Sequence, residues 1–197
     1  MSFGLHTSRL RNACIGIAGC GGLGSNCAVA LARIGIGTLV LADFDRITES
    51  NLNRQYYFLD QIGWKKTDAL RENIRRINPA VTIEAHFVRL TPENIPGLFA
   101  NCDVLVEAFD QADQKKMLIE TALKAFPEKP LVAGLGMAGW GKNDLIHTRR
   151  SDNLYICGDE VTEISEDMPP LAPRVGIVAN MQANAVVEIL LNSETGR

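Results

Sequence analysis

The first group of candidate functional residues forms a glycine-rich turn between two apolar segments. The short apolar run Ala13–Ala18 predicts a strand buried on both faces, and Leu, Val and Ile then recur at helical spacing from Leu23 to Ile34. Glycines let a backbone approach phosphate oxygens, and a helix start offers free N–H groups and the positive end of its dipole. The turn therefore predicts a phosphate-binding site formed by Gly19, Gly21, Gly22, Gly24 and Ser25.

A carboxylate follows the second apolar segment. Thr38–Ala42 predicts another buried strand, and Asp43 closes it 19 residues after Gly24. This spacing is close to the roughly 20 residues expected for the acid that holds the ribose hydroxyls of a dinucleotide. ATP carries the same ribose, so this stretch alone fits a nicotinamide dinucleotide, a flavin dinucleotide or ATP. We expect Asp45 to order the loop that follows.

Further polar residues favour a triphosphate. Asn51 and Arg54 follow Asp43, Lys66 opens the next helix, and Asp110 follows a later buried strand. Arginine offers phosphate oxygens a forked set of donors, and lysine offers a point charge. A hard divalent cation takes one or two carboxylates together with phosphate oxygens. These residues predict a site for ATP and Mg²⁺, although Asp110 could instead cap the helix that it precedes.

The motifs together resemble a known family. They comprise G-x-G-G-x-G-S at residues 19–25, D-F-D at 43–45, S-N-L-N-R-Q at 50–55 and G-W-K-K at 63–66. They resemble the ThiF/MoeB and ubiquitin-activating-enzyme superfamily, and more narrowly its short ThiF-type adenylyltransferases of thiamine biosynthesis. The resemblance extends from about Arg11 to Leu191, nearly the whole chain.

The resemblance implies a role for each candidate residue. Asp43 would hold the ribose hydroxyls, Asn51 and Arg54 would reach the phosphates, and Asp110 would bind Mg²⁺. The family register selects Lys66 rather than Lys65 as the phosphate-binding lysine. Arg54, Lys66 and Asp110 are therefore the expected catalytic residues.

The resemblance also implies a reaction and a partner. The C-terminal glycine carboxylate of a small β-grasp sulfur carrier protein ending in Gly-Gly would attack ATP, giving an acyl-adenylate. ThiS of thiamine thiazole biosynthesis is the expected carrier, a molybdopterin carrier or another small β-grasp protein is the alternative, and a homodimer is the expected assembly. Larger relatives place an arginine from a longer N-terminal segment in the partner subunit's site. Here Arg9 or Arg11 could substitute for it, although a solvated arginine leading into the first strand is the favoured interpretation.

Two other function classes stay open at this point. An NAD(P)- or FAD-dependent oxidoreductase would explain residues 13–43 but would leave Asn51, Arg54, Lys66 and Asp110 without a role. A non-catalytic docking module for a ubiquitin-like protein would explain the missing N-terminal arginine pattern but not the intact polar residues.

Composition bounds the remaining possibilities. The 197 residues fit a single domain, 1–197, and a net charge of −3 with no basic stretch argues against a nucleic-acid partner. We see neither a long apolar run nor a signal peptide, so we expect no membrane association and a cytoplasmic location. The five cysteines include no C-x-x-C pair, so we expect reduced thiols and no zinc. Cys157 is expected to be an inert buried thiol rather than a covalent link to a carrier.

The order of the predicted helices and strands indicates an α/β fold. We expect a Rossmann-like, mostly parallel sheet with helices on both faces and short antiparallel strands near the C-terminal third. Residues 134–141, rich in glycine, and 158–168, expected to be a mobile loop, are candidates for the walls of a groove that admits the carrier tail. The further expected strands are Val81–Val88, Asp103–Ala108, Pro130–Leu135, Leu145–Arg149 and Leu154–Cys157, and the helices are Asp60–Asn78 with its leading turn, Thr91–Ala100, Gln111–Ala125 and Val175–Leu191.

Overall fold

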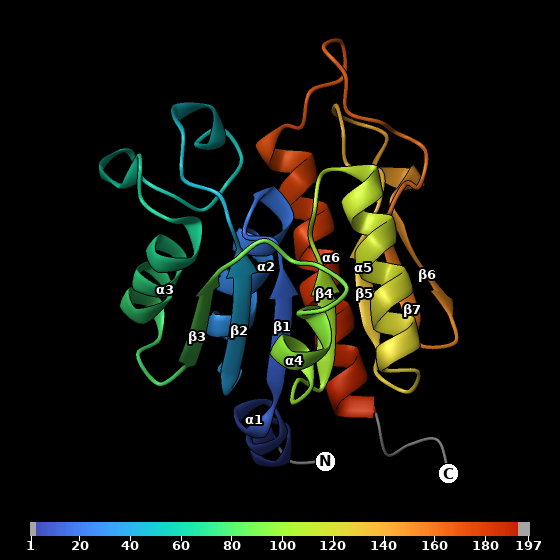
Figure 1. The fold of residues 1–197 in the computed structure, drawn as a ribbon. Helices are drawn as coiled ribbons and strands as arrows, with labels where there is room; N and C mark the ends of the chain where they lie inside the picture. The colour runs from blue at the N-terminus through green and yellow to red at the C-terminus, as the bar shows by residue number, and fades with distance from the viewer. Residues whose placement is uncertain (1–2, 193–197) are drawn as a thin grey trace.

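A single seven-stranded sheet with the strand order β3-β2-β1-β4-β5-β7-β6 forms the centre of the fold (Figure 1). The computed structural model describes residues 3–192, with side chains from residue 7 onward. All neighbouring strands are parallel except β7 and β6, which are antiparallel. The strands are β1 Cys14–Ala18, β2 Thr38–Asp43, β3 Thr82–Phe87, β4 Val104–Glu107, β5 Leu131–Gly134, β6 His147–Ser151 and β7 Leu154–Gly158.

Helices cover both faces of the sheet, as Figure 1 shows with α4 and α5 in front and α2 and α6 behind. Each face has its own apolar core: Ile17 packs with residues of α2, α3 and α6, whereas Phe99 and Leu118 pack on the α4 and α5 side. The helices are α1 Phe3–Asn12, α2 Gly22–Arg33, α3 Lys66–Ile77, α4 Ile95–Phe99, α5 Ala112–Ala125 and α6 Ala172–Asn192, and the 3₁₀ turns are η1 Glu49–Asn51, η2 Leu59–Gln61 and η3 Asn143–Leu145.

The predicted fold class is confirmed, and the helices are amphipathic. Leu70 and Ile74 of α3 are buried while Arg71 and Arg75 are exposed. The predicted helix Thr91–Ala100 is wrong in its first turn, because regular helix begins only at α4 and a turn precedes it. The predicted helix with its leading turn from Asp60 is confirmed: η2 supplies a turn there, and α3 begins at Lys66.

The N-terminal segment differs from the sequence prediction. It forms helix α1, and Arg9 Nη1 donates to the Leu191 carbonyl oxygen at the end of α6 (3.0 Å). A cation there is favourable because a helix C-terminus carries unpaired carbonyl groups and the negative end of the dipole. The interpretation of Arg9 as a solvated residue leading into a strand is therefore wrong. In Figure 1, α1 lies at the end of the sheet where β1 begins.

Helix α6 also qualifies the expectation about long apolar segments. By length and composition alone its 21 residues could cross a membrane. It packs along α2, β5 and β7, and Val178, Ala179 and Val186 on its inner face are buried. A buried core helix passes the same test of composition, so this feature is weak evidence for a membrane span.

The topology creates a crevice between β1 and β4. From β1 the chain moves outward through β2 to β3 and then returns to place β4 on the other side of β1. Ala18 at the end of β1 pairs with Ala42 of β2 and with Glu107 of β4, so these three strand ends are level. In open α/β sheets ligands bind at such a switch point, outside the carboxyl ends of the strands.

Candidate active site

A pocket of about 220 Å³ opens at this switch point. One part of its lining, which we call the polar wall, comes from the turn after β1, the end of β2 and the segment 51–66. Its residues used below are Gly19, Gly21, Gly22, Asp43, Arg54 and Lys66. Another part, the apolar wall, comes from the segments after β5 and β7 and from the start of α6, and consists of Met137, Ile164, Pro170 and Val175. Asp110 follows β4, between the strands that supply the two walls.

The glycine turn is shaped by close backbone contacts. Gly19 has a φ of +95°, and a Cβ on Gly24 would lie 1.8 Å from the Gly19 carbonyl oxygen, so neither position accepts a side chain without movement. Helix α2 begins at Gly22, with Gly21 at the N-cap and no side-chain cap. Its first N–H groups have no partner within the helix, and they lie beside the pocket.

Ser25 and Gly24 support this turn from outside the pocket lining. Ser25 is fully buried; its Oγ donates to the Gly21 carbonyl oxygen (2.6 Å) and accepts from the Tyr56 amide (3.0 Å). The Tyr57 hydroxyl likewise donates to the Cys20 carbonyl oxygen (2.7 Å). These contacts hold the glycine turn against the segment 51–66.

Asp43 closes β2 with a nearly buried carboxylate, 8% exposed, that lines the pocket. Its Oδ2 accepts from the Cys20 amide (2.6 Å) and its Oδ1 accepts from the Asp45 amide (2.7 Å). Burial raises the pKa of this carboxyl group, although Lys66 and the two amides oppose the rise. Because each carboxylate oxygen can accept more than one hydrogen bond, Asp43 can still receive a ribose hydroxyl.

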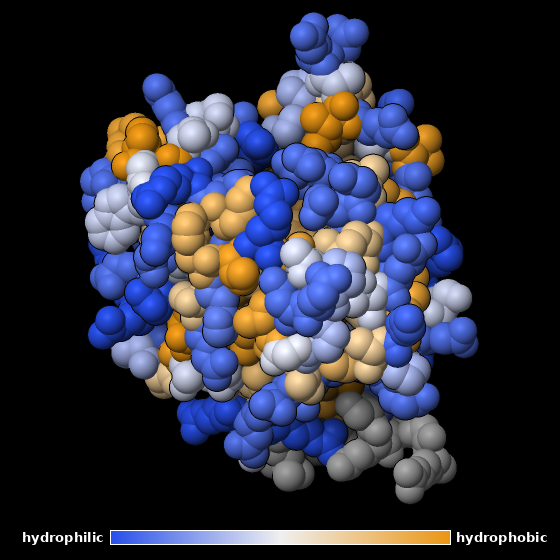
Figure 2. All heavy atoms as spheres, in the orientation of Figure 1, coloured by the Kyte–Doolittle hydropathy of each residue, from blue (hydrophilic) through white to orange (hydrophobic). Residues whose placement is uncertain are grey.

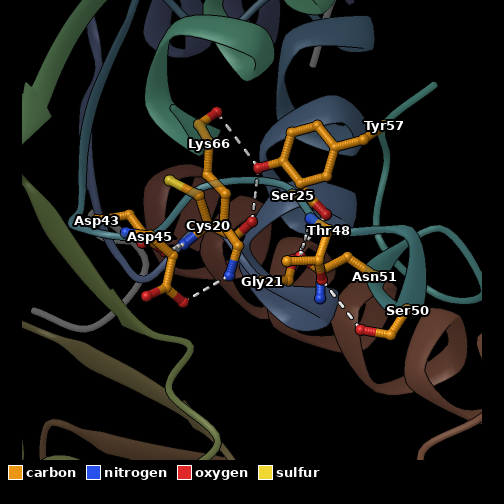
Figure 3. Close-up of polar contacts among 10 residues, drawn as sticks. All are labelled: Cys20, Gly21, Ser25, Asp43, Asp45, Thr48, Ser50, Asn51, Tyr57 and Lys66. Carbon is orange, nitrogen blue, oxygen red and sulfur yellow. Dashed lines mark hydrogen bonds and ion pairs between the residues drawn. The ribbon is translucent and has the colours of Figure 1, made fainter. Parts of the chain in front are cut away.

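Lys66 is the buried cation of the polar wall (Figure 3). Its side chain is 7% exposed, and its Nζ lies 2.7 Å from Oδ2 of Asp45, which is 48% exposed. Asp45 therefore forms an ion pair with Lys66, and the sequence analysis missed this contact. The D-x-D spacing was the available signal, since it places a second carboxylate beside the strand end.

Arg54 lines the pocket, whereas Asn51 does not. Arg54 Nη1 donates to the Ser50 carbonyl oxygen (3.0 Å) and to Asn53 Oδ1 (2.8 Å). Asn51 Oδ1 instead accepts from the Thr48 amide (3.1 Å) and caps η1. Gln55 is the better-placed amide: it is 8% exposed, lines the pocket, and its Oε1 has no partner among the described residues.

Asp110 is exposed, and its carboxylate has no hydrogen-bond partner within the described part of the chain. The capping role considered for it is wrong, because Gln111 occupies the N-cap of α5. The backbone before it is held by Glu107, whose Oε1 accepts from the Phe109 amide (2.7 Å) and whose Oε2 pairs with Lys115 (2.9 Å). Burial raises the pKa of the Glu107 carboxyl despite Lys115. An unpartnered, hard oxygen donor at the pocket fits a divalent cation that also binds phosphate oxygens.

The ThiF family matches residues 3–197 of this chain. The chain belongs to the ThiF family.

Relatives of this ThiF-family chain are named adenylyltransferases. It is 31% identical over 194 residues to the adenylyltransferase and sulfurtransferase MOCS3 of Caenorhabditis briggsae, covering 94% of this chain and 48% of that protein. It is 28% identical to the molybdopterin-synthase adenylyltransferase of Salmonella typhimurium, covering 92% of this chain and 74% of that protein. The chain thus spans about half the length of several of the curated relatives that it matches.

A solved structure confirms the fold. The E. coli tRNA N6-threonylcarbamoyladenosine dehydratase TcdA, in complex with ATP, superposes with a TM-score of 0.87 at 21% identity, covering 97% of this chain and 90% of that one. At this identity the likeness supports the arrangement of the elements alone.

The ThiF-family motifs divide into two groups in the structure. The pocket brings together Gly19, Gly21, Gly22, Asp43, Arg54, Lys66 and Asp110. Gly24, Ser25 and Asn51 lie outside the lining and shape the turns that carry it. The motifs thus contain both residues that line the pocket and residues that fix the backbone conformation of the turns beside it.

The cysteines are free thiols and form no metal cluster within the described residues. Cys157 in β7 is fully buried, and burial raises the pKa of its thiol while Thr148 opposes the rise. The thiolate is the reactive form of cysteine. Burial and a raised pKa therefore both disfavour a covalent link to a carrier at Cys157.

Proposed function

We propose that this chain adenylylates the C-terminal carboxylate of a small ubiquitin-like (β-grasp) sulfur carrier protein with ATP. The observation that carries the proposal is the convergence of Lys66, Arg54, Asp43 and Asp110 with the start of α2 on one pocket. The names of the relatives MOCS3 and molybdopterin-synthase adenylyltransferase support the reaction class. A dinucleotide reductase would use the glycine turn and Asp43 but would give Lys66 and Asp110 no role.

The reaction requires positioning rather than a general base. The carrier's terminal carboxylate is already ionised. Its oxygen attacks the α-phosphorus of ATP, the bond between that phosphorus and the oxygen bridging to the β-phosphate breaks, and pyrophosphate leaves. Charge accumulates on the phosphate oxygens during this step, so donors aimed at them lower the barrier. Lys66, Arg54 and the free amides at the start of α2 supply these donors, while Asp43 holds the ribose.

Asp110 would hold Mg²⁺ together with phosphate oxygens of ATP. The cation would neutralise charge on the leaving pyrophosphate. Lys66 must then exchange Asp45 for a phosphate oxygen when the nucleotide binds. Such an exchange is feasible because Asp45 is half-exposed, so water can solvate the carboxylate that Lys66 leaves.

A flexible Gly-Gly tail would reach the α-phosphate along the apolar wall. The segments predicted to form the groove, 134–141 and 158–168, contribute Met137 and Ile164 to the pocket lining. Exposed apolar side chains nearby, among them Trp140 and Val161, offer contact surface for the body of a carrier. Figure 2 shows apolar atoms among the loops above the carboxyl ends of the strands.

ThiS is our preferred carrier because of the resemblance to short ThiF-type enzymes, and a MoaD-type molybdopterin carrier is the competitor that the names of the relatives suggest.

We also propose a homodimer that uses the exposed face of α6 beside β6, where Ile177, Met181 and Thr148 line a shallow hollow. Sedimentation at several concentrations tests that assembly. A cytoplasmic location stays a prediction.

Pyrophosphate–ATP exchange with Mg²⁺ and carriers ending in Gly-Gly tests the proposal. We expect carrier-dependent exchange by the wild type and a loss of about 10²-fold or more in Asp110→Ala. Asp113→Ala is the matched control, because Asp113 is an exposed carboxylate in the first turn of α5 outside the pocket lining.

The other outcomes separate the competing functions. ATP binding without exchange for either a ThiS-type or a MoaD-type carrier would favour a docking module. Absence of ATP binding, combined with blue-shifted fluorescence of added NADH, would favour a dinucleotide-dependent oxidoreductase.

A further inference from the structure

The apolar wall is built from three chain segments that a buried ion pair joins. Arg174 lies in the first turn of α6 and is 3% exposed. Its Nη2 pairs with Oδ2 of Asp159, just after β7, and its Nη1 donates to the Gly141 carbonyl oxygen. One guanidinium thus connects α6 with the segment after β5 and with the segment after β7.

The position of Arg174 in α6 makes Asp159 necessary. A cation in the first turn of a helix faces the positive end of the dipole, so it is unfavourable without a nearby anion. A buried charge that loses its partner is also strongly destabilising. The planar fork of arginine reaches Asp159 and Gly141 together, and lysine offers no such fork.

Asp159 organises the start of the loop 159–168. Its Oδ1 accepts from the Val161 amide (2.9 Å), the Thr162 amide (2.8 Å) and the Thr162 hydroxyl (3.1 Å). Burial would raise the pKa of Asp159, but these donors and Arg174 hold it below its usual value. The carboxylate packs so closely on Gly136 that a Cβ there would lie 2.0 Å from Oδ1.

Backbone contacts extend this connection to the pocket. The Asp159 amide donates to the Gly136 carbonyl oxygen (3.1 Å), and the Gly139 amide donates to the Pro169 carbonyl oxygen (2.9 Å). Met137 lies between those two glycines, and Pro170 follows Pro169. Arg174 and Asp159 do not line the pocket themselves, but each element that they join supplies one of its apolar residues.

We propose that the Arg174–Asp159 pair is a positioning device for the carrier tail: it holds Met137, Ile164, Pro170 and Val175 in the shape that receives the Gly-Gly segment. This inference rests on the proposed adenylylation. It separates two tasks within one pocket, because the hydrogen bonds of Arg174 go to Asp159 and Gly141 and not to the polar-wall residues that would bind ATP.

Steady-state exchange kinetics of Arg174→Met, Arg174→Lys and Asp159→Asn test the inference. We expect Arg174→Met to raise the KM for the carrier about tenfold or more, with the KM for ATP and kcat within about twofold. Arg174→Lys should recover part of that loss, because it restores the charge but not the fork. Arg149→Met is the control, since Arg149 makes an exposed pair with Glu160 in the same region and exposed pairs contribute little.

A second readout does not depend on activity. Proteolysis by a glutamate-specific protease reports on the loop through the exposed residues Glu163 and Glu166. Cleavage there should be faster in Arg174→Met and Asp159→Asn than in the wild type and Arg149→Met. If the wild type shows no exchange, the adenylylation proposal fails. Faster cleavage of Arg174→Met and Asp159→Asn would then still support the ion pair as the anchor of this wall.

Three results would overturn the inference. Equal increases in the KM for ATP and for the carrier would indicate general loosening of the pocket. An unchanged carrier KM with faster cleavage would show that the tail does not use this wall. Failure of both Arg174→Met and Asp159→Asn to fold would make the pair a requirement of folding rather than a positioning device.

Discussion

A buried cation paired with an aspartate supports each wall of the pocket, and the two pairs differ in what surrounds them. In the polar wall, Lys66 contacts Asp45, which is half-exposed, and both residues line the pocket. Behind the apolar wall, Arg174 contacts Asp159, both are almost fully buried, and neither lines the pocket. An ion pair that water reaches can exchange partners, whereas a pair sealed from water is held in place.

The difference indicates a division of labour. A lysine ammonium has three rotatable donors and can turn from a carboxylate to a phosphate, whereas an arginine fork bound to two segments acts as a brace. The comparison predicts that changes in the polar wall act on the chemical step and that changes in the apolar wall act on carrier binding.

The largest expected effect comes from Lys66. Lys66→Met should lower kcat for carrier-dependent exchange about 10²–10³-fold, because it removes a donor aimed at the phosphates. Lys65→Met should stay within about twofold, since Lys65 Nζ lies over the Phe87 ring (4.6 Å to the centroid) and outside the pocket lining. Exchange kinetics at saturating carrier measure both. Equal losses in the two variants would mean that the polar wall does not depend on the buried lysine.

The next effect concerns the glycine turn. Gly24→Ala should lower the free energy of unfolding by about 1–3 kcal/mol and weaken ATP binding, because the new methyl group would overlap the Gly19 carbonyl. Gly176→Ala in α6 is the control: nothing lies within 4 Å of its Cβ position, so it should stabilise by about 0.5–1 kcal/mol. Urea denaturation and ATP titration measure the two quantities. A stable Gly24→Ala protein with unchanged ATP affinity would contradict the tight turn.

The smallest expected effect is at Cys157. Cys157→Ser should leave adenylylation within about twofold, and the native thiol should react slowly with iodoacetamide at neutral pH, because burial raises its pKa. Mass spectrometry of the alkylated native protein measures the reaction. Rapid labelling of Cys157, or a carrier conjugate that the substitution abolishes, would add a covalent function to the apolar wall.

Much of the polar wall could be predicted from local sequence. The order strand, glycine turn, helix and strand is encoded by apolar periodicity within residues 13–43, and its ligand-facing residues are close in sequence to the turns that carry them. Sequence spacing could not separate Asn51 from Gln55, because the 3₁₀ turn η1 decides which amide faces the pocket. It also missed helix α1, whose polar sequence lacks a strong apolar stripe.

The apolar wall depends on tertiary structure. Asp159 and Arg174 are 15 residues apart, in segments with no shared motif, and they meet only because β7 lies beside β5 and α6 returns across the sheet. The sequence by itself therefore determined the fold class, the glycine turn and most residues of the polar wall. Only the three-dimensional structure decided which ion pair is exposed to the ligand and which is sealed, because burial depends on contacts between segments that are distant in the chain.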